Sequence, residues 1–302
     1  MTAAPTTGTR EITCEVLRDG CFDGLDIVIV DVDDPIALEW APVAAAAGAR
    51  VVDNSAAFRG EADIPLVVAE VNPGDLDALP RNIASCPNCT TMVLLTALAP
   101  LHRAAGIDRM VVSTYQAVSG AGQAGMDELD EQWLARATDL APLRRAAAVD
   151  GTITPGKVWG SPIAGNAIPL AGSVREAGYT SEEWKLVRET HKILHDDAIR
   201  VTATCVRVPV YVGHSMTANV QFRSAMDAAR AAAGRPLAER MEAVSRPLLG
   251  LPYLKDAAGE GAVDVVGGSA QAGGDRPGSR RAGRGGSAAA STDRRAATGR
   301  HR

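Results

Sequence analysis

The sequence predicts an α/β protein in which a partial doubly wound, Rossmann-like sheet is followed by an α+β domain. Two observations support this fold class. Short β-branched runs alternate with an Ala-rich helical run early in the chain, which is typical of parallel βαβ units. Farther along, a long β-branched run follows a helix with a clear N-terminal cap. With 302 residues, of which 46% are hydrophobic and 22% charged, the chain can bury a sizeable core.

The first part of the chain contains the elements expected for the parallel sheet. Leu25–Val30 is a short apolar run that predicts a buried strand. Ile36–Ala47 is Ala-rich and predicts a helix, with Gly48 as its stop signal. Two further strands are expected at Arg50–Asp53 and Leu66–Val68.

The rest of the chain alternates between predicted helices and strands. The helix after Cys89 should end at Gly106, because glycine is the usual residue past a helix C-terminus. The remaining expected elements, in order, are a strand at Arg109–Thr114, helices at Met126–Thr138 and Thr180–His195, a long strand at Ile199–Val212 and its hairpin neighbour at Met216–Phe222.

The C-terminal segment differs in composition from everything before it. From Asp275 to Arg302 the residues are mainly Gly, Ala, Ser and Arg, with almost no large apolar side chain. Such a segment cannot bury enough surface to offset chain entropy, so we expect disorder there. Two interpretations stay open: an RNA-binding basic tail, or out-of-frame reading of GC-rich DNA, which we favour.

Bulk properties exclude several classes of function. The net charge of −5 argues against a nucleic-acid partner. No apolar run reaches membrane-spanning length and the first residues lack a signal-peptide core, so we expect a cytoplasmic protein. Five scattered cysteines make no disulfide framework, and no set of four ligands at useful spacing predicts a metal site.

The segment S-C-P-N-C-T-T, which ends at Thr91, carries the strongest chemical signal. Cys89 lies directly before a predicted helix, where the helix dipole and free N–H groups lower the pKa of a thiol. Those N–H groups can also stabilise an oxyanion. Cys89 is therefore a candidate nucleophile, with a buried structural cysteine as the alternative.

A second signal lies in R-V-P-V-Y-V-G-H-S, from Arg207 to Ser215. A histidine near neutral pH is the usual proton shuttle, so His214 is a candidate acid or base, although such a histidine is often structural. Arg207 lies inside a β-branched run, where burial is costly unless an anion meets the guanidinium. Because the two residues are seven apart, the turn at Gly213 must bring them together.

Seven motifs together resemble the aspartate-semialdehyde dehydrogenase family, and they occur in that family's order. Any one of them alone would be weak, whereas seven in order are specific. They are D-N-S-A-A-F-R (53–59), P-L-V-V-A-E-V-N (65–72), C-P-N-C-T-T (86–91), S-T-Y-Q-A-V-S-G-A-G (113–122), E-E-W-K (182–185), H-K-I-L (191–194) and C-V-R-V-P-V-Y-V-G-H-S (205–215).

The resemblance implies reduction of L-aspartyl-4-phosphate to L-aspartate-4-semialdehyde, with NADP(H) as cofactor, in the biosynthesis of lysine, threonine, methionine and diaminopimelate. It implies Cys89 as nucleophile through a thioester, His214 as general acid/base and Gln116 as the residue that orients the acyl group. It further implies Arg207 at the substrate carboxylate and Glu182 at the amine. The other implied roles are phosphate binding by Arg59, Asn88 and Lys185 and nicotinamide contact by Ser119 and Gly120.

The same resemblance implies three segments and a homodimer. Residues 1–88 would be a remnant of the dinucleotide-binding domain, 89–257 a catalytic and dimerisation domain, and 258–302 a disordered Gly/Ala/Arg-rich tail. The family's Gly-rich turn does not precede Leu25, and nothing after Phe222 resembles its C-terminal cofactor helix. We therefore expect exposed sheet edges, poor stability, little activity and no measurable binding of NADP by this chain.

Two alternatives to this enzyme stay open at the level of sequence. One is an enzyme like N-acyl-glutamyl-phosphate reductase, which shares the acyl-phosphate chemistry, although E-E-W-K and C-V-R-V-P favour the aspartate enzyme. The other is a catalytically impaired fragment that only dimerises. Each candidate residue also has an ordinary interpretation, since Glu182 and Lys185 could be a surface ion pair and Ser119-Gly120 only a turn.

Overall fold

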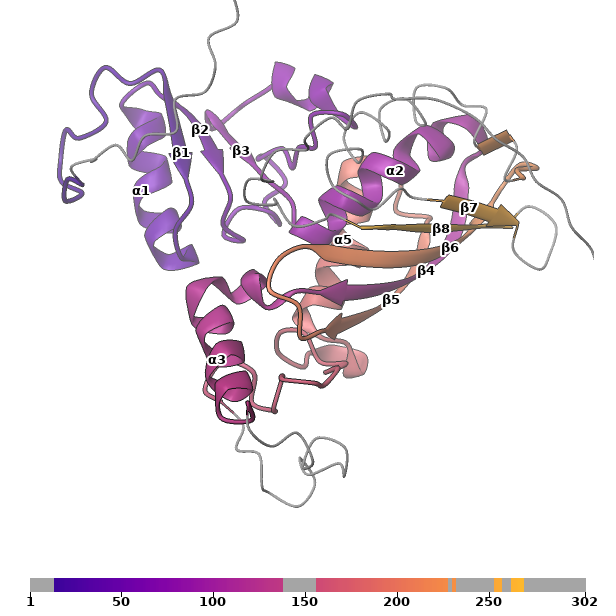
Figure 1. Ribbon diagram of the computed structural model, residues 1–302. Helices are drawn as coiled ribbons and strands as arrows, with labels where there is room; N and C mark the ends of the chain where they lie inside the picture. Colours follow the sequence, from indigo (N-terminus) through magenta and orange to yellow (C-terminus); the bar gives the residue numbers. More distant parts are fainter. Residues whose placement is uncertain (1–13, 138–155, 228–229, 232–252, 257–261, 269–302) are drawn as a thin grey trace, which may run out of the picture. The chain divides into compact units, whose positions relative to one another are not determined.

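The protein contains two β-sheets in a computed structural model that describes residues 14–137, 156–227, 230–231, 253–256 and 262–268. One sheet has three strands and the other has five (Figure 1). All described residues belong to one compact unit, Met1–Gln271. The predicted α/β class is confirmed, while the three-segment division stays a prediction.

The three-stranded sheet is parallel, with the order β1-β2-β3. Its strands are β1 (Ile27–Val30), β2 (Arg50–Asp53) and β3 (Ile83–Ser85). Helix α1 (Asp34–Ala46) covers one face, because its small residues let the helix approach the sheet closely. The core between them consists of Val28, Val30, Val51 and Ile83 from the strands and Ala37, Ala41 and Ala44 from α1.

The strand predicted at Leu66–Val68 is wrong. Only an isolated bridge joins Leu66 to Ser85. The Asn72 side chain explains this, because its oxygen accepts a hydrogen bond from Val68 N at 2.8 Å and its nitrogen donates to Leu66 O at 2.9 Å. A side chain thus occupies the backbone groups that a strand partner would need. The third strand is instead β3, which is only three residues long and which the sequence pattern missed.

Strand β1 forms one edge of this sheet among the described residues. Two of its side chains, Ile27 and Ile29, are 64% and 74% exposed. They alternate with Val28 and Val30, which face α1, so the second face of the strand is uncovered. This edge agrees with the exposed sheet edge expected from the sequence.

The five-stranded sheet is mixed and has the order β5-β4-β6-β8-β7. Strand β4 (Ile107–Gln116) lies between β5 (Arg200–Arg207), which runs parallel to it, and β6 (His214–Phe222), which runs antiparallel. The hairpin predicted between the last two strands is therefore wrong. Strand β5 ends at Arg207, and the chain then crosses the end of β4 before β6 begins.

Two strands also correct the predicted tail. Strands β7 (Tyr253–Asp256) and β8 (Ala262–Gly268) pair antiparallel with each other, and β8 pairs with β6. The tail predicted to begin at residue 258 thus includes a strand, because the run A-V-D-V-V is β-branched despite its Ala- and Gly-rich surroundings. The segment 275–302 lies outside the described residues.

Helices α2 (Cys89–Ala105) and α5 (Ser181–Leu194) pack against the five-stranded sheet. Leu94 and Leu98 of α2 share a buried cluster with Leu186 of α5 and with strand residues such as Met110 and Val220. Helix α5 begins with a capping box formed by Thr180 and Glu183. The other helical elements are η1 (Pro73–Asp77), η2 (Val118–Ala121), α3 (Gly122–Leu134) and η3 (Glu176–Gly178).

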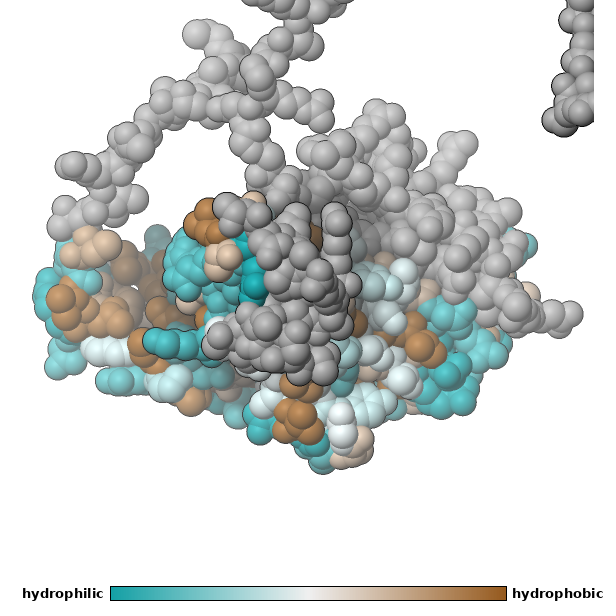
Figure 2. Space-filling model, turned by 60° about the horizontal axis from the view of Figure 1, so that its bottom comes forward, coloured by the Kyte–Doolittle hydropathy of each residue, from teal (hydrophilic) through white to brown (hydrophobic). Residues whose placement is uncertain are grey.

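The described surface mixes hydrophobic and hydrophilic residues, as one face of the molecule shows (Figure 2). None of the described helices is long and apolar enough to cross a membrane.

Candidate active site

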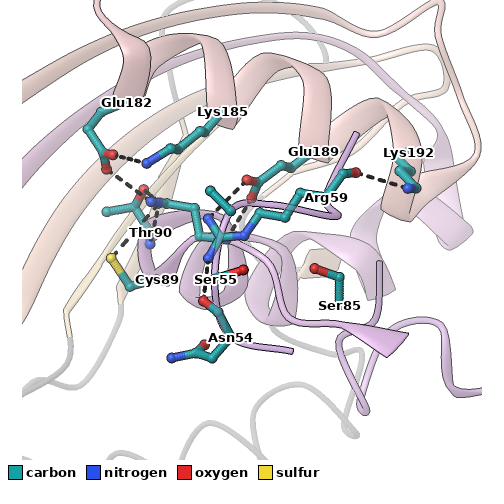
Figure 3. A network of polar contacts seen from close by, with 12 residues as sticks. Asn54, Ser55, Arg59, Ser85, Cys89, Thr90, Glu182, Lys185, Glu189 and Lys192 are labelled. Carbon is teal, nitrogen blue, oxygen red and sulfur yellow. Dashed lines mark hydrogen bonds and ion pairs between the residues drawn. The ribbon is translucent and has the colours of Figure 1, made fainter. Parts of the chain in front are cut away.

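Cys89 is the first residue of helix α2, as the sequence predicts. Asn88 is the N-cap, and its side-chain oxygen accepts hydrogen bonds from Thr90 N at 3.0 Å and Thr90 Oγ1 at 2.6 Å. The Cys89 thiol lies 3.9 Å from the same oxygen. The thiol of Cys89 therefore lies beside the hydrogen bonds between Asn88 and Thr90 that cap the helix (Figure 3).

The electrostatics of Cys89 differ from the expectation. Cys89 is an exposed residue, yet the protein atoms around its sulfur partly desolvate the thiol. This desolvation, together with the Glu182 carboxylate, raises the pKa of the thiol above its ordinary value, while the backbone N–H of Thr90 and the cations Arg207 and Lys185 act in the opposite direction without reversing the shift. The helix start lowers the pKa as predicted, but partial desolvation has the larger effect.

Three candidate residues form one row across the end of the five-stranded sheet. In register, Gln116 of β4 pairs with Arg207 of β5 on one side and with His214 of β6 on the other. All three residues are buried. Parallel pairing places the carboxyl ends of β4 and β5 together, and β6 begins where they end. The sheet thus brings together residues that are seven or more positions apart in sequence.

The loop after β5 makes this row possible. Val208 N donates to Gln116 O at 2.9 Å, and Ala117 N donates to Gly213 O at 3.2 Å, so the loop is fastened across the end of β4. Gly213 has a φ of 95°, which is in the region that favours glycine. The chain therefore enters β6 on the far side of β4 with His214 in the row.

His214 is buried, and its Nδ1 lies 3.0 Å from Ala117 N and 2.9 Å from Gly213 O. Burial lowers the pKa of its imidazole, and Arg207 lowers it further, while the Gly213 carbonyl and Glu182 oppose the shift. The ring is therefore neutral near pH 7 and able to accept a proton.

Arg207 is buried, and an aromatic side chain that the sequence analysis missed lies beside it. Its Nη1 donates to Ala117 O at 2.8 Å, and its guanidinium carbon lies 4.9 Å from the centre of the Trp159 ring. Its Nε is buried and has no hydrogen-bond partner among the described atoms. A guanidinium fixed in this way can receive an anion.

Gly120 closes the row on one side. A Cβ added there would lie 2.7 Å from Arg207 Nη1, so a larger residue would displace the end of the arginine, while His214 Cε1 at 3.6 Å is in ordinary contact distance. Its neighbour Ser119 is fastened through its backbone, because Ser119 N donates to Tyr211 O at 3.0 Å. Both residues belong to η2, directly after β4.

Glu182 and Lys185 of α5 face the start of α2. Glu182 accepts hydrogen bonds from Lys185 Nζ at 2.5 Å and from Asn88 Nδ2 at 2.9 Å. Burial alone would raise the pKa of Glu182, but the Lys185 ammonium and these hydrogen bonds reverse the shift and lower it. Glu182 is therefore a carboxylate near pH 7, and the pair lies in the site rather than on an open surface.

Arg59 reaches the same region from the segment after β2. Its Nη2 donates to Asn54 O at 3.0 Å, and its Nη1 lies 3.4 Å from Glu189 Oε1. Glu189 also accepts a 2.7 Å hydrogen bond from Asn88 N. The sequence analysis did not single out Glu189. The signal for it was its position seven residues after Glu182, which places both residues on one side of α5.

Helix α1 follows β1 without a Gly-rich turn, and its start is unsuited to a pyrophosphate. Its N-cap is Asp33 and its first turn holds Asp34, so two acidic residues lie at the helix N-terminus. Among the described residues there is also no cluster of three or more His, Cys, Asp or Glu side chains that could hold a metal ion.

Comparison with known families matches both parts of the chain. Residues 2–79 match the family model described as the NAD binding domain of semialdehyde dehydrogenase. Residues 98–269 match the model described as its dimerisation domain. The second match extends past Phe222, while the expected lack of the C-terminal cofactor helix stays a prediction.

Several relatives show the same similarity. The chain is 43% identical over 213 residues to an aspartate-semialdehyde dehydrogenase of Streptomyces akiyoshiensis, which covers 70% of this chain and 63% of the relative. It is also 43% identical to aspartate-semialdehyde dehydrogenase 2 of Vibrio cholerae over 67% of this chain and 57% of that protein. The chain thus spans less than two thirds of these relatives' length.

Solved structures agree with the sequence relatives. The crystal structure of aspartate semialdehyde dehydrogenase II from Vibrio cholerae superimposes with a TM-score of 0.69 and 35% identity. The superposition covers 81% of this chain and 74% of that one. A second structure of that enzyme, complexed with ASA, gives a TM-score of 0.68 at 34% identity.

Proposed function

Because the chain belongs to the aspartate-semialdehyde dehydrogenase family, we propose that it carries out the acyl-phosphate reduction of that family. The substrate would be L-aspartyl-4-phosphate and the products L-aspartate-4-semialdehyde and phosphate. This proposal rests on the site itself. A thiol lies at the start of a capped helix, and Arg207, Gln116 and His214 lie in register at the end of the five-stranded sheet.

In the proposed first step, the sulfur of Cys89 attacks the acyl carbon of the substrate. The bond between that carbon and the phosphate oxygen breaks, phosphate leaves with the bonding electron pair, and a thioester forms. The pKa of the Cys89 thiol is raised and that of His214 is lowered, so both groups are neutral near pH 7. We therefore assign His214 as the base that accepts the thiol proton during the attack.

The charged residues divide between the two ends of the substrate. Arg207 has a buried Nε without a partner, which suits the substrate carboxylate, and Glu182 is held ionised, which suits the substrate amine. Arg59, Lys185 and Asn88 would hold the departing phosphate. Gln116 is buried in the centre of the row and would orient the acyl group.

A nicotinamide cofactor, NADP(H) in our proposal, supplies the hydride that converts the thioester to the aldehyde when it is bound. Ser119 and Gly120 are the residues proposed to lie beside its reacting end, since Gly120 contacts the row. The acidic start of α1 does not fit its phosphates, so no cofactor phosphate is assigned to that helix. The match to a dimerisation domain supports a homodimer as the proposed assembly.

The proposal is tested by assaying the reverse reaction with L-aspartate-4-semialdehyde, inorganic phosphate and a saturating concentration of NADP. Formation of NADPH, followed by absorbance, is the expected result for the unaltered chain. Cys89→Ser should lower the rate by roughly 10³-fold or more, because a nucleophile is removed. Cys86→Ser is the matched control and should retain the rate. No turnover by the unaltered chain, or near-normal turnover by Cys89→Ser, contradicts the proposal.

A further inference from the structure

We propose that Glu189 is a positioning residue whose two carboxylate oxygens hold the start of the nucleophile's helix and the arginine of the phosphate site in a fixed relation. This inference rests on the proposed function for the roles of Cys89 and Arg59. It goes beyond that function by giving α5 a second task, separate from the substrate contact proposed for Glu182.

The geometry of Glu189 is that of a bridge. Its Oε2 accepts the backbone N–H of Asn88, directly before Cys89, at 2.7 Å. Its Oε1 pairs with Arg59 Nη1 at 3.4 Å, and Arg59 comes from a segment 130 residues earlier in the chain. Figure 3 shows the Glu189 carboxylate and the Arg59 guanidinium pointing toward one another. One side chain thus contacts both halves of the proposed site.

Burial makes this arrangement demanding. Glu189 is 5% exposed, and its desolvation raises the pKa of the carboxyl, while Arg59, the Asn88 N–H, the Thr91 hydroxyl and Lys185 stabilise the ionised form. A buried carboxylate is costly unless its oxygens are paired. Arg59 and the Asn88 N–H are the two largest of these stabilising contributions, so the carboxylate depends chiefly on them.

Lys192 lies one turn farther along α5 and binds the backbone of the segment that contains Arg59. Its ammonium donates to the carbonyl oxygens of Arg59, Glu61 and Ile64 at 2.9, 2.6 and 2.8 Å. All three of its protons are thereby used. Lys192 fixes the backbone of Arg59, so Glu189 needs to orient only the side chain of Arg59. A change at Glu189 should therefore leave the backbone of residues 59–64 in place.

The bridge should influence the thiol through Asn88 and not by direct charge. The charge of Glu189 is not among the causes that shift the pKa of Cys89. The hydrogen bond from the Thr90 N–H is one of these causes, and it lowers the pKa. That N–H is held by the Asn88 side chain. If Asn88 loses its own anchor, the first turn loosens, the Thr90 N–H stabilises the thiolate less, and the pKa of Cys89 rises further.

The test compares two changes at Glu189 with a matched control on the same helix. Glu189→Gln keeps an oxygen that can accept from Asn88 N but loses the charge that pairs with Arg59, whereas Glu189→Ala loses both. Glu183→Gln is the control, because Glu183 is 7% exposed and accepts from Thr180 N and Cys205 N without contacting Asn88 or Arg59. All variants are made in the full chain with Cys86→Ser, so that the Cys89 peptide has one thiol.

The first readout is the alkylation of Cys89 by iodoacetamide at pH 7, followed by peptide mass spectrometry. Glu189→Ala should slow it by about three- to tenfold, which corresponds to a rise of half to one pKa unit. Glu189→Gln and the control should remain within about twofold of the parent, since Asn88 keeps its acceptor in both. Alkylation requires no turnover, so this result is independent of whether the proposed reaction occurs.

The second readout is protection of Cys89 from alkylation by inorganic phosphate. Both Glu189 variants should need about threefold more phosphate or more, because both lose the ion pair that orients Arg59, while the control should not change. If both Glu189 variants match the control in both readouts, the positioning role is wrong. If alkylation changes as expected but phosphate never protects even the parent chain, the proposed phosphate site fails while the Asn88 anchor stands.

Discussion

At the scale of single residues, the thiol of Cys89 lies between charges of opposite sign. Glu182 raises the pKa of the thiol and Lys185 lowers it, although the two residues are themselves a hydrogen-bonded pair. Because a thiol reacts as the thiolate, its alkylation rate rises with pH through its pKa. The raised pKa of Cys89 thus places the midpoint of this rise above that of an ordinary thiol.

We predict opposite shifts when the two charges are removed. Glu182→Gln removes a negative charge, so the midpoint of Cys89 alkylation should move to lower pH by about half to one unit. Lys185→Met removes a positive charge and should move the midpoint to higher pH. Arg188→Gln, which alters an exposed ion pair on the same helix, is the control and should leave it in place. Two shifts of the same sign would contradict this electrostatic account.

The sequence identified most of these residues by motif but not the contacts between them. Arg207 was unusual because an arginine within a β-branched run calls for an anion, and the structure places it buried in the row with Gln116 and His214. Trp159 and Glu189 were missed because their importance comes from partners far away in sequence. The seven-residue spacing of Glu182 and Glu189 indicates a shared side of α5, but it does not identify Asn88 or Arg59 as partners of Glu189.

At the scale of elements, the ends of α2 and α5 were predicted best because their caps depend on neighbouring residues, whereas the helix predicted at Met126–Thr138 is α3, Gly122–Leu134. The sequence predicts Thr180 or Ser181 as the cap of α5, and in the structure it is Thr180, whose side chain accepts from Glu183 N while Glu183 accepts from Thr180 N. The pairing of strands was predicted worst. Strands β5 and β6 are adjacent in sequence, but β4 lies between them, and only the whole sheet decides which strand lies beside which.

We predict that the cap of α5 contributes measurably to stability. Thr180→Ala should lower the free energy of unfolding by about 1–2 kcal/mol, because it leaves a buried N–H without its acceptor. Thr96→Ala is the matched control within helix α2, where the threonine hydroxyl donates only to Met92 O, and it should change stability by less than about 0.5 kcal/mol. Urea unfolding of the three proteins measures the difference. Equal losses for both changes would show that the cap has no special role.

At the scale of the whole molecule, the two sheets differ in how completely they are covered. The five-stranded sheet has helices α2 and α5 packed against it, and its core includes residues from five elements that carry the site, namely α2, α5, β4, β5 and β6. The three-stranded sheet has α1 on one face, while Ile27 and Ile29 of its edge strand are exposed. The late strands β7 and β8 were not predicted, because the composition around them is rich in Ala and Gly.

Acyl transfer to Cys89, the first half of the proposed reaction, can be tested apart from hydride transfer. The residues proposed for acyl transfer are all described and lie together, and this step requires no cofactor. The measurement is therefore a rapid-quench reaction of the full chain with L-aspartyl-4-phosphate in the absence of NADPH, combined with mass spectrometry of the peptide that contains Cys89. We predict a burst of about one phosphate per active chain and an aspartyl adduct on Cys89 that is absent from Cys89→Ser. Phosphate release without an adduct, or an adduct that persists in Cys89→Ser, would contradict the account.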